Sequence, residues 1–272
     1  MKPYYDANGT TLYHGDCRAV LLSLDTVDHV LTDPPYARDV YHRLQSPNSH
    51  KGSGTPARMG IRNHQYSSVS IEKLAAGAIG NIDEMLAEVA LEIARLTRRW
   101  ALVFSDSESI HQWRGQLESA SMRYVRTGAW VKPDPMPQFS GDRPSVGFEP
   151  CTIMHAQGAM RWNGGGSAAV WTYGTVKKDR PDHPCPKPLG LMCELVKLFT
   201  DEGDLILDPF SGSSTTLVAA KRLGRRAIGI EVDEKFCEVS AKRLESEERQ
   251  GVMNFKPTQQ RFTEELLANT AD

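Results

Sequence analysis

Asp33, Pro34, Pro35 and Tyr36 directly follow an apolar run that begins at Val27. Proline fixes its own φ angle and pushes the residue before it into extended geometry, so the Asp33 carboxylate and the adjacent carbonyls are held rigidly. Such acceptors suit an exocyclic nucleobase amine, whose delocalised lone pair makes it a poor nucleophile. Hydrogen bonds from the amine to a fixed carboxylate and carbonyl would favour a pyramidal nitrogen that can attack an electrophile.

Tyr36 adds a flat face on which a base flipped out of a duplex could stack. We therefore predict that Asp33, Pro34, Pro35 and Tyr36 form a catalytic platform. The alternative is that the tetrapeptide is an ordinary turn between a strand and a loop.

A second group of small and acidic residues follows the apolar run at 205–207. Gly212 and its small neighbours would let a ligand approach the backbone, and the N-terminus of a following helix favours a carboxylate. The next apolar run ends at Glu231, and an acid at a neighbouring strand end commonly holds ribose hydroxyls. A dehydrogenase or a structural turn would show the same glycine turn. The predicted cofactor ligands are Asp208, Pro209, Phe210, Ser211, Gly212, Ser213, Thr215 and Glu231.

The elements that must position these residues alternate between short apolar runs and amphipathic stretches. This alternation is typical of βαβ units and predicts an α/β fold with a doubly wound, mostly parallel sheet. Strands are expected at 27–32, 100–104, 205–207 and 227–231, with weaker candidates at 12–14, 124–131 and 152–155. Helices are expected at 82–98, 189–199, 215–223 and 234–244.

In this order, the motifs resemble those of amino-methylating DNA methyltransferases with the circularly permuted motif order called the beta class. Asp33 to Tyr36 matches the catalytic motif of the family, Asp208 to Gly212 its methionine motif and Ile228 to Glu231 its ribose motif. The resemblance implies a class I, Rossmann-like methyltransferase fold and S-adenosylmethionine as the cofactor.

Two further segments extend the resemblance to the family. His183 and Lys187 lie in a segment similar to the His-Pro-x-x-Lys-Pro segment that in the family lies against the methionine end of the cofactor. Asp16 lies in a similar Gly-Asp segment, which implies a contact with the cofactor adenine. Residues 130–133 and 148–150 also match places where the family has similar residues. His183 could instead cap the helix that begins near residue 189.

The substrate implied by the resemblance is the N6 amine of an adenine in double-stranded DNA. Within the family, aspartate at the first position of the tetrapeptide favours adenine and serine favours cytosine, but methylation of cytosine N4 stays an alternative. In a protein or RNA methyltransferase Asn-Pro-Pro-Tyr is the commoner form, and a non-catalytic DNA-binding module would be expected to carry a damaged tetrapeptide.

The charge distribution indicates where DNA would bind. The formal net charge is only -2, but affinity for phosphates depends on where the cations lie. The segment 37–80 is locally basic, although a solvated loop would have the same composition. We predict residues 1–248 to form one catalytic domain and 249–272 a polar tail. The segments 37–80 and 132–182 are expected to be inserted loops or a small accessory lobe, the second a candidate target recognition region. The predicted DNA-binding residues are Arg38, Arg43, Lys51, Arg58 and Arg62.

The remaining composition excludes several protein classes. The five cysteines form no CxxC pair, so neither a metal site nor a disulfide framework is expected. No apolar run approaches the roughly 20 residues that span a bilayer, and we therefore expect a soluble, cytoplasmic protein without a membrane partner. A homodimer and a companion restriction endonuclease are candidate partners.

Overall fold

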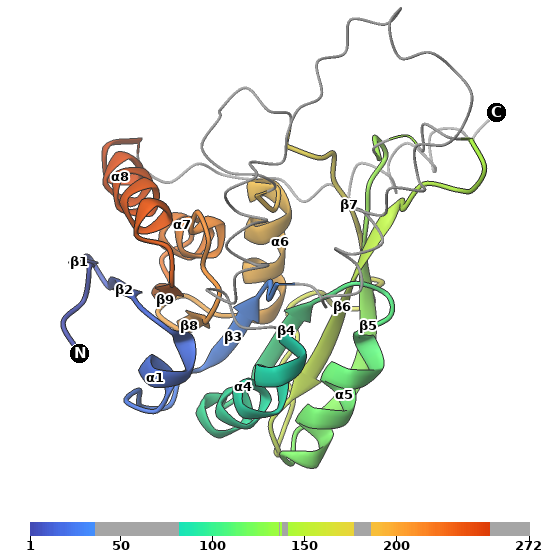
Figure 1. Ribbon diagram of the computed structural model, residues 1–272, viewed down its shortest axis with the longest axis horizontal. Coiled ribbons are helices and arrows are strands. Elements are labelled where there is room, and N and C mark those ends of the chain that lie inside the picture. Colours follow the sequence, from blue (N-terminus) through green and yellow to red (C-terminus); the bar gives the residue numbers. More distant parts are fainter. Residues whose placement is uncertain (36–81, 136, 138–140, 177–185, 251–272) are drawn as a thin grey trace, which may run out of the picture.

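The computed structural model of the protein describes residues 1–35, 82–135, 137, 141–176 and 186–250. Within them, one mixed sheet of nine strands is covered by helices on both faces (Figure 1). The strands, in the order in which they lie side by side, are β1 (Tyr5–Ala7), β2 (Thr10–His14), β9 (Arg226–Glu231), β8 (Leu205–Asp208), β3 (His29–Thr32), β4 (Trp100–Phe104), β6 (Phe148–His155), β5 (Arg123–Val131) and β7 (Val170–Thr172).

Parallel pairing predominates in this sheet. The five strands β2, β9, β8, β3 and β4 are parallel to one another, and β5 is parallel to β7. Antiparallel pairs occur where β1 joins β2 and where β6 lies between β4 and β5. The prediction of a mostly parallel α/β sheet is confirmed, and the antiparallel strands are features that the sequence did not indicate.

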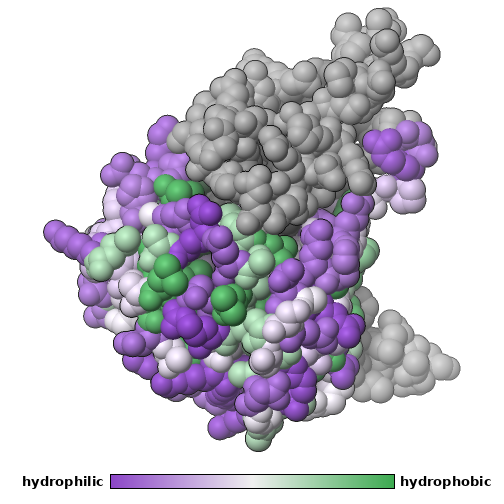
Figure 2. Space-filling model, turned by 60° about the horizontal axis from the view of Figure 1, so that its bottom comes forward, coloured by the Kyte–Doolittle hydropathy of each residue, from purple (hydrophilic) through white to green (hydrophobic). Residues whose placement is uncertain are grey.

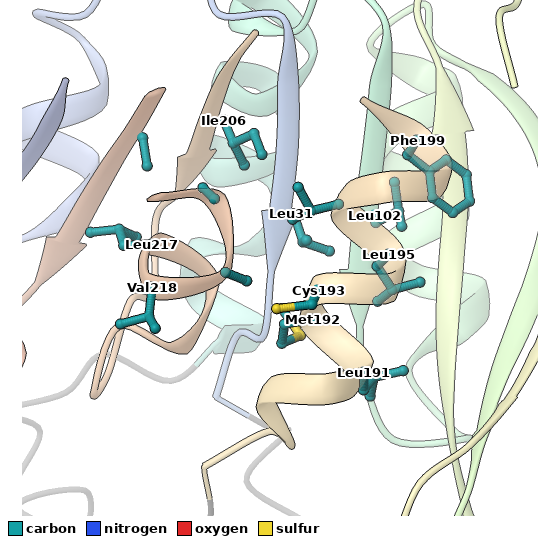
Figure 3. Packing of buried hydrophobic residues seen from close by; sticks show 14 of the residues in the cluster. Leu31, Leu102, Leu191, Met192, Cys193, Leu195, Phe199, Ile206, Leu217 and Val218 are labelled. Carbon is teal, nitrogen blue, oxygen red and sulfur yellow. The ribbon is translucent and has the colours of Figure 1, made fainter. Parts of the chain in front are cut away.

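Helices pack on both faces of the sheet because successive strand residues point to opposite sides. One face carries α6 (Leu189–Phe199), α7 (Thr215–Arg222) and α8 (Glu234–Gln250), and the other carries α1 (Cys17–Leu21), α4 (Ile82–Leu96) and α5 (Ile110–Ser119). Figure 3 shows the first of these two cores, where Leu195 and Phe199 of α6 and Leu217 of α7 pack with Leu31 and Leu102 of the sheet. Val30 and Val103, their neighbours along the strands, belong to the opposite core.

The chain leaves β3 and β8 in opposite directions. The connection β3–α4–β4 moves toward one edge of the sheet, whereas β8–α7–β9 moves toward the other, although β3 and β8 are neighbours. In open α/β sheets, ligands bind outside the carboxyl ends of the strands at such a topological switch point. The topology therefore places the expected site where β3 and β8 end.

The observed elements test the sequence-based assignments. All the predicted strands and helices occur, with boundaries that differ by up to six residues. The largest difference is at α8, which continues to Gln250 and so reaches into the predicted tail. The segment 132–182, expected to form loops or a small accessory lobe, contains all of β6 and β7, which extend the sheet. The candidate strand at 152–155 is the end of β6, whereas β7 was not predicted. Strand β1 and helices α1 and α5 were not predicted. The segment 37–80 lies outside the described residues.

Figure 2 shows one face of the molecule, on which hydrophilic residues surround several apolar patches. Among the described residues, no helix is both long enough and apolar enough to span a membrane.

Candidate active site

Three predicted site carboxylates lie at the same edge of the sheet. Asp33 directly follows β3, Asp208 ends β8 and Glu231 ends β9, and these three strands run parallel. The structure thus brings the two groups of residues singled out in the sequence to one edge, on both sides of the switch point between β3 and β8.

Asp33 offers one free acceptor at this edge. Its side chain is 32% exposed, and the Lys187 ammonium donates a hydrogen bond to Oδ2. The other oxygen, Oδ1, is buried and has no hydrogen-bond partner in the described part of the chain. Burial raises the pKa of Asp33, with the charge of Glu149 adding to the effect and Lys187 opposing it. An unpaired buried acceptor is costly, which is typical of a group that awaits a substrate donor.

Lys187 lies between two carboxylates. Its ammonium contacts Oδ2 of Asp33 and, at 2.9 Å, Oε2 of Glu149, and its side chain is only 8% exposed. Burial disfavours the charged form, but Asp33 and Glu149 outweigh it and raise the pKa of Lys187. A cofactor contact of Lys187 stays a prediction, while its described contacts join it to the catalytic tetrapeptide.

Two charged residues at this site were not among the predicted site residues. Glu149 lies in β6 and accepts a hydrogen bond at 2.5 Å from Lys132, which directly follows β5. Burial acts against the charged form of Glu149, but Lys187 and Lys132 outweigh it and lower its pKa to about 2. The sequence signal was the resemblance of residues 130–133 and 148–150 to family segments, which gave no role to either charge.

Asp208 joins strand β3, which precedes Asp33, to the turn between β8 and α7. It is buried, and its carboxylate accepts hydrogen bonds from Thr32 at 2.7 Å, from Thr216 at 2.6 Å and from the backbone N–H of Phe210 at 3.1 Å. Thr32 immediately precedes Asp33, so this carboxylate connects the end of β3 with the start of α7. A direct cofactor contact of Asp208 stays a prediction.

We expect replacement of Asp208 by asparagine to stabilise the fold progressively as pH rises. Burial raises the pKa of Asp208 to about 6 from an ordinary 3.8. Folding therefore favours the neutral acid, and the stability that this provides is lost as pH rises through about 6. Asparagine keeps one oxygen for Thr32 and Phe210 and stays neutral throughout.

Between pH 4 and pH 7 the free energy of unfolding of Asp208→Asn should gain about 2 kcal/mol relative to the parent. Urea denaturation across this range measures the gain, with the exposed Asp25→Asn as the control. A difference that is constant with pH would contradict the assignment of a buried, titrating carboxyl.

The turn between β8 and α7 is shaped by its own side chains. Gly212 and Ser214 both have positive φ angles, of 50° and 61°. A left-handed conformation costs a non-glycine residue roughly 1 kcal/mol or more, and Ser214 adopts it directly before α7. The Ser214 hydroxyl lies 2.7 Å from that of Ser211. From α8, Arg243 donates hydrogen bonds to the carbonyl and hydroxyl oxygens of Ser213.

Glu231 is tied to the same turn. One carboxylate oxygen accepts the backbone N–H of Gly212 at 2.9 Å, and the other accepts that of Asp233 at 2.8 Å. Burial raises the pKa of Glu231, and these N–H groups oppose the shift. A carboxylate has about four acceptor positions, so acceptors remain for ribose hydroxyls. Gly229 of β9 allows α7 to pack closely against this strand, because a Cβ at Gly229 would lie 2.7 Å from the Leu217 side chain.

Asp16 lies at the same edge, just after β2. Its carboxylate caps α1 by accepting the backbone N–H of Arg18 at 2.9 Å, and it forms an ion pair with the Arg18 side chain at 2.6 Å. These hydrogen bonds lower the pKa of Asp16. Gly15 donates its N–H to the carbonyl of Glu231 at 2.9 Å, so Asp16 is close along the chain to the ribose candidate. Its contact with the cofactor adenine stays a prediction.

Several predicted site residues lie outside the described part of the chain. They are Tyr36, His183 and the five basic residues Arg38, Arg43, Lys51, Arg58 and Arg62. Across the described ranges, no group of three or more His, Cys, Asp or Glu side chains could hold a metal ion.

Comparison with known proteins decides the family. The model of the N6/N4 DNA methylase family matches residues 27–242, most of the chain. The chain belongs to this family. Among characterised relatives, it is 28% identical to the type II methyltransferase M2.DpnII of Streptococcus pneumoniae, over 90% of this chain and 93% of that protein. It is 27% identical to M2.LlaDCHI of Lactococcus lactis, over 89% of this chain and 92% of that protein.

Solved structures of DNA methyltransferases share the fold. The complex of M1.HpyAVI with S-adenosylmethionine has a TM-score of 0.64 and 22% identity, over 86% of this chain and 98% of that chain. The cytosine-N4-specific PvuII methyltransferase has a TM-score of 0.66 and 15% identity, over 97% of this chain and 93% of that chain. The predictions of a DNA methyltransferase, of the class I fold and of S-adenosylmethionine as the cofactor of this family are confirmed.

Proposed function

We propose that this DNA methyltransferase methylates the N6 amine of adenine. The observation that carries the proposal is Oδ1 of Asp33, a buried acceptor without a described partner at the carboxyl edge of the sheet. The other carboxylate oxygen, Oδ2, accepts a hydrogen bond from Lys187, so Oδ1 is left for a substrate donor. Aspartate at this position of the tetrapeptide supports adenine over cytosine, as the resemblance to the family indicates.

The chain provides the groups that hold the cofactor. Glu231 has acceptor positions left for ribose hydroxyls, and the left-handed Gly212 allows a ligand to approach the turn closely. The N-terminus of α7 follows directly and favours the methionine carboxylate. When bound, S-adenosylmethionine supplies a methyl group on a sulfonium sulfur, which leaves as a neutral thioether.

Asp33 acts on the amine of the target base. By accepting one N–H through Oδ1, the charged carboxylate increases the electron density on nitrogen and favours the pyramidal geometry of attack. The nitrogen lone pair forms the new N–C bond while the C–S bond breaks with its electron pair on sulfur. The resulting methylated amine carries a positive charge and releases one proton to solvent, with Asp33 stabilising the charge until then.

Nucleoside analysis tests the choice of base. DNA incubated with the protein and labelled S-adenosylmethionine is digested, and the methylated nucleosides are identified by mass spectrometry. We expect label in N6-methyladenine. Label in N4-methylcytosine would overturn the proposed base, and label in RNA or protein but not in DNA would overturn the substrate class.

We also propose that the basic segment 37–80, which follows the catalytic tetrapeptide, contacts DNA phosphates. Replacing Arg43, Lys51 and Arg58 together by alanine should weaken binding to all DNA sequences without changing the modified base. Each lost phosphate contact should flatten the dependence of log K on log salt by about one unit, because fewer counterions are released.

Binding titrations over a salt series measure this slope. Replacing the exposed Lys235 and Lys242 of α8 by alanine provides the control, since α8 is rich in acidic residues. A slope equal to that of the parent would assign the segment to solvated surface. Target recognition by 132–182, the single domain over 1–248, the homodimer and the companion endonuclease stay predictions.

A further inference from the structure

The catalytic aspartate belongs to a chain of four alternating charges, which we call the Asp33 network. Lys187 bridges Asp33 and Glu149, and Glu149 in turn accepts from Lys132. The members come from four separate places in the chain: after β3, in β6, after β5 and just before α6. The fold therefore assembles the network, and its two cations balance its two anions.

The network is enclosed and walled by aromatic rings. The side chains of Glu149 and Lys132 are each 16% exposed, and that of Lys187 is 8% exposed. The Lys187 ammonium lies 5.0 Å from the ring centre of Phe104, and the Lys132 ammonium lies 4.7 Å from that of Trp130. Buried ion pairs stabilise folds little compared with apolar side chains of the same volume, so stability alone is a weak reason for this arrangement.

We propose that Lys187, Glu149 and Lys132 are positioning residues for methyl transfer. Lys187 occupies Oδ2 of Asp33 and thereby leaves Oδ1 as the carboxylate oxygen that can accept from the target amine. Glu149 fixes the ammonium of Lys187, and Lys132 compensates the charge of Glu149. The inference rests on the proposed role of Asp33 in amine methylation, but it holds for either base amine.

The network also controls the charge of Asp33. Lys187 and Lys132 favour the carboxylate, whereas burial and the charge of Glu149 disfavour it. Asp33 also interacts electrostatically with Asp208 of the adjacent strand β8 and with Cys151 of β6, and the variants leave both residues unchanged. Removing a cation should therefore raise the pKa of Asp33, and removing the Glu149 charge should lower it.

The pH profile of single-turnover methyl transfer to DNA tests the proposal, because the acidic limb reports the loss of the Asp33 charge. Lys187→Met should lower the rate at neutral pH at least about tenfold and move this limb to higher pH. Lys132→Gln should move it in the same direction by less. Glu149→Gln should move it to lower pH. A merely structural role would not produce shifts of opposite sign.

The controls separate positioning from cofactor binding and from folding. Lys242→Gln, an exposed variant on α8, should keep the parent profile. Calorimetry should show unchanged affinity for S-adenosylmethionine in Lys132→Gln and Glu149→Gln, and Lys187→Met should lose much less affinity than rate. A Lys187→Met protein that lost cofactor affinity as strongly as rate would make Lys187 a cofactor ligand and overturn the proposal. If Lys187→Met fails to fold, Lys132→Gln and Glu149→Gln test the proposal instead. Acidic limbs at the same pH as in the parent for both variants would overturn it.

The methylated product shows whether the proposed base is wrong, independently of whether the network proposal fails. If the parent labels cytosine N4, the proposed base is wrong, while the shifts of the acidic limb still test the network on that substrate.

Discussion

Replacing Asp33 by alanine is expected to lower the single-turnover rate of methyl transfer by about a hundredfold or more and to leave cofactor affinity within about twofold of the parent. The loss of one preorganised acceptor commonly has an effect of this size. Cofactor affinity should persist because the described contacts of Asp33 lead to Lys187, and the groups that we assign to the cofactor follow β8 and β9. Transfer of labelled methyl groups and calorimetry measure the two quantities.

Two variants sharpen the interpretation of this result. Asp33→Asn keeps the size of the side chain and one oxygen but removes the charge that faces Lys187. Its rate of methyl transfer should therefore lie between those of the parent and of Asp33→Ala. Asp25→Ala, an exposed aspartate ahead of β3, should behave as the parent. Near-normal transfer by Asp33→Ala would remove Asp33 from the mechanism.

Replacing Glu231 by alanine is expected to weaken the binding of S-adenosylmethionine by about ten- to a hundredfold. Hydrogen bonds to a charged group contribute about 1.5–3 kcal/mol, and every 1.4 kcal/mol is tenfold in the dissociation constant. The variant also frees the backbone N–H groups of Gly212 and Asp233, which the carboxylate now holds. Calorimetric titration with the cofactor gives the dissociation constants.

Glu231→Gln and Glu234→Ala form the matched set for this prediction. Glutamine keeps an oxygen for one of the two backbone N–H groups and should lose less affinity than alanine. Glu234 is exposed at the start of α8, three residues farther along the chain, and its loss should leave binding unchanged. If Glu231→Ala bound the cofactor as tightly as the parent, the assignment of Glu231 to the ribose would be wrong.

The local pattern of the sequence predicted the elements that form the centre of the fold. Trp100 to Phe104 is a continuous apolar run, and it forms a strand that is buried on both faces. Leu189 to Phe199 has apolar residues at helical spacing and forms α6 with the same bounds. Such patterns are visible because burial in a parallel sheet or against one helix face imposes a period that neighbouring residues share. β7 escaped notice because three residues are too few to show a period.

The residues of the candidate site could also be identified in the sequence, because each lies within a short motif. Asp33 is followed by two prolines, and Gly212 lies in a turn between a strand and a helix. The sequence could not show that Asp208 holds Thr32 and Thr216, since these hydrogen bonds depend on how closely β3 and α7 approach β8.

Sequence alone therefore determined the family resemblance, the class of fold and the identity of the main carboxylates, since all three follow from residues adjacent along the chain. Only the tertiary structure decided which charges meet. Lys187 follows Asp33 by 154 positions, and Lys132 and Glu149 are 17 positions apart in the chain, yet they form one network. The order of strands in the sheet and the pairing of β5 with β6 bring these charges together, and no local pattern specifies that contact.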